Sequence, residues 1–226
     1  MKRVGVVLCG CGRFDGSEVQ EAVLTLLHLV RAGAQPVCMA PDSPQWAVCE
    51  HFGGKTVVDQ RRNQLHEAAR IARGEIVALG RVAAADLDAV ILPGGTGAAR
   101  NLCDFFQDGA KSVVLPELGT LLRETHAAGK PIGAICIAPV IVALALGGHG
   151  PRLTLGRTDG PAVEAAKTGA RFEACAVDEI VADEVQRIVS TPAYILARDI
   201  GEADAGIGKL VARILAMCGA PVAETA

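Results

Sequence analysis

One cysteine lies where the sequence changes from a strand pattern to a helix pattern. Residues 132–135 form a short apolar run of the length that a buried strand needs, and residues 137–146 continue as an apolar helix that tolerates Pro139 in its first turn. Cys136 falls between them. Backbone N–H groups and the helix dipole at such a site lower a cysteine pKa from about 8.5 to roughly 3.5–7.5. We therefore expect Cys136 to be a nucleophile; the competing interpretation is a structural cysteine buried in the core.

Two further segments offer the groups that a nucleophile needs around it. Residues 86–93 predict a buried strand, and Gly94-Gly95-Thr96-Gly97 follows as a turn whose backbone can approach a ligand closely. Glu18 opens the first predicted helix, with Ser17 as its expected N-cap. The simpler interpretations are a tight turn that needs glycine at positive φ, and an acidic residue that the helix dipole favours.

The elements that would position these residues alternate between strand and helix. Strands are predicted at residues 3–9, 35–40, 86–93 and 132–135, and helices after Ser17, at 63–72, at 116–128 and after Cys136. This order predicts right-handed crossovers and a mostly parallel sheet. Ligands of such sheets bind at the carboxyl ends of the strands. To bring Glu18 and Cys136 together there, we expect the first strand and the cysteine strand to be neighbours.

The last third of the chain predicts shorter elements. Segments at residues 174–177, 180–182 and 187–190 read as short strands, antiparallel near one edge of the sheet. A closing helix is expected at 205–218, followed by a short tail. No repeat or linker divides the sequence, so we expect a single domain over residues 1–226.

Composition excludes several functional classes. Half of the 226 residues are apolar and 21% are charged, which predicts a packed core. The net charge of −3, without a basic stripe, argues against a nucleic-acid partner, and no apolar run is long enough to suggest a membrane partner. The eight cysteines show no zinc-finger spacing, so no metal is expected. The glycines of residues 10–16 do not fit a dinucleotide fingerprint. Without a cleavable signal pattern at the start, we expect reduced cysteines and a cytoplasmic protein.

Several motifs together resemble the PfpI/ThiJ superfamily. They are DAVILPGG at residues 88–95, IGAICIAP at residues 132–139, and Glu18 at the start of the first helix. The opening from Cys9 to Glu18, with residues 97–102 and 191–194, resembles the ElbB group of that superfamily. This group is also described as isoprenoid biosynthesis proteins with an amidotransferase-like domain. The resemblance extends essentially from end to end.

The resemblance implies an α/β fold: a flavodoxin-like three-layer sandwich with a mostly parallel sheet, like class I glutamine amidotransferases, and with Cys136 on a nucleophile elbow. It implies a glutathione-independent glyoxalase that needs no cofactor, converts glyoxal and related 2-oxoaldehydes to glycolate-type hydroxy acids, and is sometimes interpreted as a protein deglycase. The dicarbonyl would form a hemithioacetal on Cys136. The superfamily's glutamate maps to Glu18, and its oxyanion-type backbone donors map to Gly95 and Ile137. Superfamily members are commonly dimers, so a homodimer is compatible with the resemblance.

The sequence differs from related branches of the superfamily at positions that their activities require. Ile137 follows Cys136, where chaperone and protease-like branches carry histidine. Glutaminases need a histidine and a glutamate late in the chain, whereas the last histidine here is His149, in a glycine-rich loop, so we expect no glutaminase activity. The alternatives are a redox or metabolite sensor that oxidises Cys136, and a non-catalytic accessory protein of isoprenoid metabolism. The expected substrate pocket contains Gly94, Asn101, Phe14 and Tyr194.

Overall fold

A seven-stranded sheet forms the centre of the computed structural model, which describes residues 1–219; residues 220–226, most of the expected tail, lie outside the described part. Neighbouring strands are parallel except at one edge, where β10 runs antiparallel to β11, as predicted. The strands in spatial order are β10 (Val181–Asp183), β11 (Ile188–Thr191), β7 (Ile132–Ile135), β6 (Ala89–Leu92), β1 (Arg3–Val7), β2 (Gln35–Ala40) and β5 (Ile76–Ala78).

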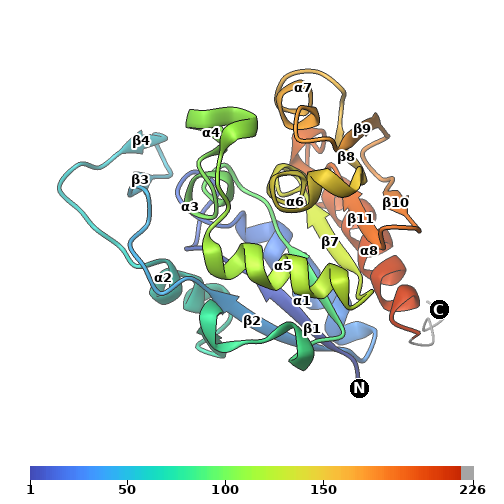
Figure 1. The fold of residues 1–226 in the computed structure, drawn as a ribbon. Helices are drawn as coiled ribbons and strands as arrows, with labels where there is room; N and C mark the ends of the chain where they lie inside the picture. The colour runs from blue at the N-terminus through green and yellow to red at the C-terminus, as the bar shows by residue number, and fades with distance from the viewer. Residues whose placement is uncertain (220–226) are drawn as a thin grey trace.

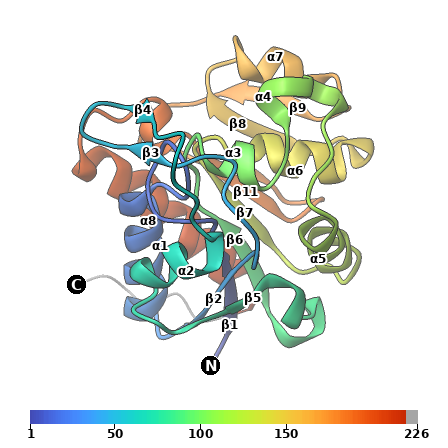
Figure 2. The ribbon, with the colours of Figure 1, turned by 90° about the vertical axis from the view of Figure 1, so that its left-hand side faces the viewer.

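Helices cover both faces of this sheet, which gives the three layers expected of a flavodoxin-like fold. Helices α1 (Val19–Arg31) and α8 (Ile200–Met217) pack on one face, and α5 (Pro116–Ala127) and α6 (Pro139–Leu146) pack on the other (Figures 1 and 2). Because both faces are covered, every residue of β6, β7 and β11 is buried. Within residues 1–219, no helix is both long enough and apolar enough to cross a bilayer.

Shorter strands and helices lie around the central sheet. A hairpin of two short strands projects from one side of the molecule, and a two-stranded parallel sheet with its own helix lies beside α6 (Figure 1). The strand predicted at residues 174–177 lies three residues earlier in the chain, as β9 (Arg171–Ala174). These elements are β3 (Cys49–Glu50), β4 (Lys55–Thr56), α2 (Gln64–Ile71), α3 (Ala98–Asn101), α4 (Phe105–Asp108), β8 (Arg152–Gly156), α7 (Pro161–Ala166) and β9 (Arg171–Ala174).

The order of the strands differs from the expectation at one point that matters for the site. β1 and β7 are not neighbours, because β6 pairs with both of them. Adjacent strands lie about 4.8 Å apart, so a side chain from the end of β1 must reach across the end of β6 to approach Cys136. The loop that follows β6, with its glycines, therefore occupies the middle of the candidate site.

The start of α1 also differs from the expectation. Ser17 does not cap this helix; its hydroxyl accepts a hydrogen bond from the Cys9 N–H at 3.0 Å. The N-cap is Glu18, whose carboxylate accepts from the Glu21 N–H at 2.7 Å. The helix thus begins with a negative charge at its positive end, an arrangement that the helix dipole stabilises.

Candidate active site

Cys136 lies on a sharp turn between β7 and α6. Its φ of 59° is in the left-handed region, which few residues other than glycine adopt. The Cys136 N–H donates to the Thr191 carbonyl at 2.9 Å, which ties the turn to the end of β11. The backbone N–H groups of Gly95 and Ile137 lie near the sulfur and act to lower the pKa of the thiol. The residue is 9% exposed, so the thiol is nearly covered.

The carboxyl group at this thiol belongs to Glu21, in the first turn of α1. Glu21 is fully buried, and its carboxyl group lies close enough to the Cys136 thiol for each group to affect the pKa of the other. Its two oxygens accept from the Gly94 N–H at 2.9 Å and from the Tyr194 N–H at 3.3 Å. A buried carboxyl group is thus held on three sides against the sulfur.

Gly94 makes this contact possible. A Cβ atom at position 94 would lie 2.6 Å from the Cys136 Cβ and 2.9 Å from a Glu21 carboxyl oxygen. Any side chain here would therefore fill the space in which the thiol and the carboxyl group meet. Because β6 separates β1 from β7, the missing side chain at the end of β6 is what lets the two groups contact each other.

The sequence placed this carboxyl group at Glu18, and the structure places a different one there. Glu18 caps α1 with its carboxylate directed at the Glu21 N–H, whereas Glu21 turns inward one helical turn later. The first turn of α1 carries both acids, and only the rotation of the helix decides which one faces the sulfur. Glu21, Thr25 and Leu29, spaced at i, i+4 and i+8, form a fully buried face of the helix, but Glu21 and Thr25 are polar, so apolar periodicity in the sequence does not reveal this face.

The pKa values of the pair are raised rather than lowered. Burial and the charge of Glu18 raise the pKa of Glu21 to about 8. Burial and the Glu21 carboxyl also raise the pKa of Cys136 well above its ordinary value, against the N–H groups of Gly95 and Ile137. The expected lowering of the Cys136 pKa is therefore wrong, because the site excludes water and places an acid at the sulfur. Such a pair loses its protons in coupled steps, so the raised pKa values belong to the pair.

Of the residues expected to line a pocket, two lie at this pair and two lie elsewhere. Gly94 and Tyr194 both contact Glu21 through their backbone, and the Tyr194 hydroxyl donates to Gln20. Asn101 is buried among loops instead: it donates to the Asp15 carbonyl at 2.8 Å and accepts from the Trp46 N–H. Phe14 packs against His51 of the β3–β4 hairpin, with ring centroids 5.1 Å apart. Asn101 and Phe14 therefore shape the loops around the site.

The histidines lie away from the sulfur. His149 is at the far end of α6 from Cys136, exposed and stacked on His126 with ring centroids 4.6 Å apart. His28 pairs with Asp204, and His51 binds the Cys49 carbonyl. In the part of the chain that the structure describes, no cluster of three or more possible metal ligands is present.

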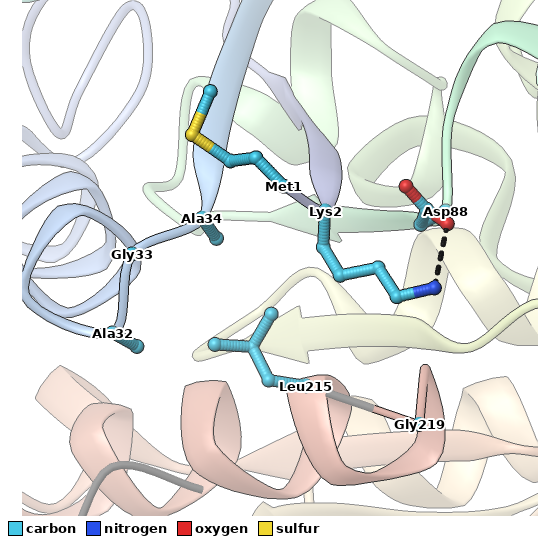
Figure 3. A pocket seen from close by; sticks show the side chains of 8 residues that line it. All are labelled: Met1, Lys2, Ala32, Gly33, Ala34, Asp88, Leu215 and Gly219. Carbon is cyan, nitrogen blue, oxygen red and sulfur yellow. Dashed lines mark hydrogen bonds and ion pairs between the residues drawn. The ribbon is translucent and has the colours of Figure 1, made fainter. Parts of the chain in front are cut away.

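A separate pocket lies at the opposite end of the sheet, near the amino ends of the strands. Figure 3 shows Lys2 and Asp88 paired there, at 3.1 Å, beside Leu215 of α8. The pocket is lined by Met1, Lys2, Ala32, Gly33, Ala34, Asp88, Leu215 and Gly219. It contains none of the residues that surround Cys136.

Comparisons with known proteins agree with the fold. A model of the DJ-1/PfpI family matches residues 7–190. The ES1 protein homolog, mitochondrial, of Rattus norvegicus is 40% identical, covering 96% of this chain and 84% of the relative. The glutamine amidotransferase-like class 1 domain-containing protein 3, mitochondrial, of Homo sapiens is 41% identical, with the same coverage. A solved structure of an isoprenoid biosynthesis protein with an amidotransferase-like domain from Ehrlichia chaffeensis superposes with a TM-score of 0.90 and 33% identity, covering 96% of this chain and 99% of that one.

These relatives correct one expectation. The cytoplasmic location inferred from the start of the chain is contradicted by relatives whose names place them in mitochondria. The inference rested on the lack of a secretory signal pattern, and a secretory pattern says nothing about mitochondrial targeting.

Proposed function

Because the chain belongs to the DJ-1/PfpI family, we propose that it is a glyoxalase that uses Cys136 as nucleophile and Glu21 as acid and base, without a cofactor. The observation that carries the proposal is the contact between a fully buried carboxyl group and a cysteine at positive φ, with two backbone N–H groups on the sulfur. The substrate is glyoxal or a related 2-oxoaldehyde, and the product is the corresponding 2-hydroxy acid.

The first step is addition of the Cys136 sulfur to the aldehyde carbon. A carbon–sulfur bond forms, the carbonyl π bond breaks, and the thiol proton ends on the former carbonyl oxygen, which gives a hemithioacetal. The N–H groups of Gly95 and Ile137 lie at the sulfur, next to the carbon that it attacks. They are therefore suited to stabilise negative charge on the oxygen of that carbon as it develops.

The second step moves hydrogen between the two carbons. The ionised form of Glu21 takes the proton from the carbon bonded to sulfur and returns it to the neighbouring carbonyl carbon, through an enediol-like intermediate. The hydroxyl proton on the first carbon passes to the oxygen of the second carbon in the same step. The first carbon is oxidised to a thioester while the second is reduced to an alcohol, so no external oxidant is needed. Water then cleaves the thioester, which releases the hydroxy acid and restores the thiol.

The narrower assignment to the ElbB group is part of this proposal. The Ehrlichia chaffeensis protein, which carries the description used for that group, covers nearly the whole chain. The motif from Cys9 to Glu18 supports it as well, because this segment forms the loop that packs on Gly95 and Gly97: a Cβ atom at Gly97 would lie 2.0 Å from the Gly16 nitrogen. A motif that fits a glycine loop so closely is a specific feature of the site.

Turnover of glyoxal by the purified protein tests the proposal. We expect glycolate formation that Cys136→Ser lowers by at least roughly 10³-fold. Cys218→Ser, a matched change at the other end of the sheet, should keep the wild-type rate. Intact-mass spectrometry of the wild type during turnover should show an adduct on Cys136.

Two outcomes would contradict the proposal. Wild-type turnover by Cys136→Ser would exclude this cysteine as the nucleophile. Absence of glycolate, together with selective oxidation of Cys136 by low peroxide, would favour the redox sensor, whose sulfur also needs a neighbouring acid.

A further inference from the structure

Two carboxyl groups occupy the first turn of α1, and only one of them touches the sulfur. Glu21 is fully buried against Cys136, whereas Glu18 is half-buried at the N-cap. Residues three apart on a helix have Cβ atoms about 5–6 Å from each other. The two acids are therefore close enough for the charge of one to act on the other.

The position of Glu18 is fixed by several hydrogen bonds. Its carboxylate accepts from the Glu21 N–H at 2.7 Å, and its own N–H donates to the Gly94 carbonyl at 2.9 Å. Gly94 in turn donates its N–H to the Glu21 carboxyl. Glu18 and Glu21 are thus held by the same glycine, which also lies against Cys136, and Glu18 has little freedom to move its charge away.

We infer that Glu18 is a positioning residue whose negative charge controls when the Cys136–Glu21 pair releases its first proton. The inference rests on that pair, as the proposed function does, but it does not depend on glyoxal being the substrate. With Glu18 ionised, a second negative charge one helical turn away is disfavoured, so the pair keeps both protons to a higher pH.

The groups that face the pair come from three elements. Glu18 lies on α1 itself, Arg13 lies in the loop before α1, and the Tyr194 phenol follows β11. Burial raises the pKa of Glu18, and the backbone N–H groups of the first turn and the charge of Arg13 oppose this rise, so Arg13 helps to keep Glu18 ionised. The charge of Glu18 raises the pKa of both Glu21 and Tyr194. Of these groups, Glu18 is the acidic one that is both fixed at the helix end and partly open to solvent.

A matched pair of variants separates the charge of Glu18 from its capping role. Asp and Asn are both good N-cap residues of nearly equal size, and they differ in charge. We therefore compare Glu18→Asp with Glu18→Asn. The measurement is the rate of Cys136 alkylation by iodoacetamide as a function of pH, followed by peptide mapping, which requires no turnover. Thermal unfolding of both variants establishes that each is folded.

The quantity compared is the pH midpoint of the Cys136 alkylation rate. We expect Glu18→Asp to keep the wild-type midpoint and Glu18→Asn to shift it to lower pH by roughly one unit. Arg13→Gln leaves the cap in place and makes Glu18 easier to protonate, so it should shift the midpoint in the same direction as Glu18→Asn by a smaller amount, and it provides a second measurement if Glu18→Asn unfolds. Equal midpoints for Glu18→Asp and Glu18→Asn would overturn the inference, because capping alone would then explain Glu18. A shifted alkylation midpoint in Glu18→Asn, without glyoxal turnover by the wild type, would support the inference and contradict the proposed function. Glyoxal turnover by the wild type, with equal alkylation midpoints for the two Glu18 variants, would support the proposed function and contradict the inference.

Discussion

Cys136 and Cys218 lie at opposite ends of the central sheet, each beside the end of a helix. Cys136 precedes α6 and receives two backbone N–H groups on its sulfur. Cys218 is the C-cap of α8, and its thiol donates to the Asp88 carbonyl at 3.5 Å. Burial and the charge of Asp88 raise the pKa of Cys218 to about 11, and burial and Glu21 raise the pKa of Cys136 as well, but only at Cys136 do backbone N–H groups oppose the rise. A helix presents N–H groups at one end and carbonyls at the other, so only the first end stabilises a thiolate.

The pocket shown in Figure 3 lies at the same end of the sheet as Cys218, near the paired side chains of Lys2 and Asp88. The sulfur of Cys136, by contrast, is nearly covered. The backbone N–H groups and the buried acid therefore lie at the end of the sheet where we propose catalysis, whereas the pocket lies at the other end. The following changes test that difference between the two ends.

The largest effect is expected from Glu21→Gln at the carboxyl end of the sheet. Glutamine keeps the shape of the side chain but cannot take up and return a proton, so turnover of glyoxal should fall by roughly 10²–10⁴-fold. Steady-state kinetics should show this fall in kcat, with KM little changed. A rate within a factor of two of the wild type would remove Glu21 from the mechanism.

The same substitution should change how stability depends on pH. Glu21 titrates near 4.5 in an unfolded chain and at about 8 in the folded protein, so the folded state binds more protons between these values. The free energy of unfolding should therefore fall as the pH rises through this window. Glu21→Gln should lack this component, which we expect to amount to a few kcal/mol. Urea unfolding at about pH 5 and about pH 8.5 measures it, and parallel changes in the two proteins would show that Glu21 is not held protonated.

Replacing one glycine at each end of the central sheet with alanine compares the space available for a side chain at the two ends. A Cβ at Gly94 would collide with Cys136 and Glu21, whereas a Cβ at Gly33, beside the pocket at the amino end, meets nothing within 4 Å. Gly33→Ala should cost about 1 kcal/mol, from its φ of 70° alone, and leave turnover unchanged. Gly94→Ala should cost about 1–3 kcal/mol from overpacking and should also lower turnover. Urea unfolding and kinetics on both variants check this, and equal turnover would show that the gap at Gly94 is dispensable.

The smallest effect is expected from Lys2→Met. The Lys2 and Asp88 side chains are about one-third exposed, and exposed ion pairs contribute about 0–1 kcal/mol. The loss should shrink further in high salt, and turnover should stay at the wild-type level. A loss of turnover in Lys2→Met would give the amino end a role that its geometry does not suggest.

The sequence could predict the parts of the site that lie within a single strand-to-helix turn. Cys136 follows from two apolar runs next to each other in the chain, and the alternation of elements predicts a mostly parallel sheet. Gly95 and Ile137 as backbone donors, and the three layers, are what the family resemblance implies. The order of β1, β6 and β7 does not follow from this, because a crossover fixes handedness and leaves open which strands become neighbours.

The choice between Glu18 and Glu21 illustrates the other limit. Apolar residues at helical spacing in α1 include Val23, Leu27 and Val30, which are 47%, 37% and 61% exposed. The helix is apolar on nearly all sides, so periodicity does not determine its rotation about its axis. That rotation is set by contacts with Gly94 and with α8, which lie far away in the sequence. Residues three apart differ by only about 60° around the helix axis, so a small error in the rotation exchanges Glu21 for Glu18.

The backbone of Cys136 has a consequence for how such a protein changes over time. A cysteine at φ 59° costs the folded state about 1–2 kcal/mol relative to a residue without a Cβ atom. Glycine at this position would relieve the strain and abolish the nucleophile in one substitution. Selection for stability alone would thus favour losing the thiol, and lineages that no longer need its chemistry should lose it at this position early, while the surrounding sheet remains intact.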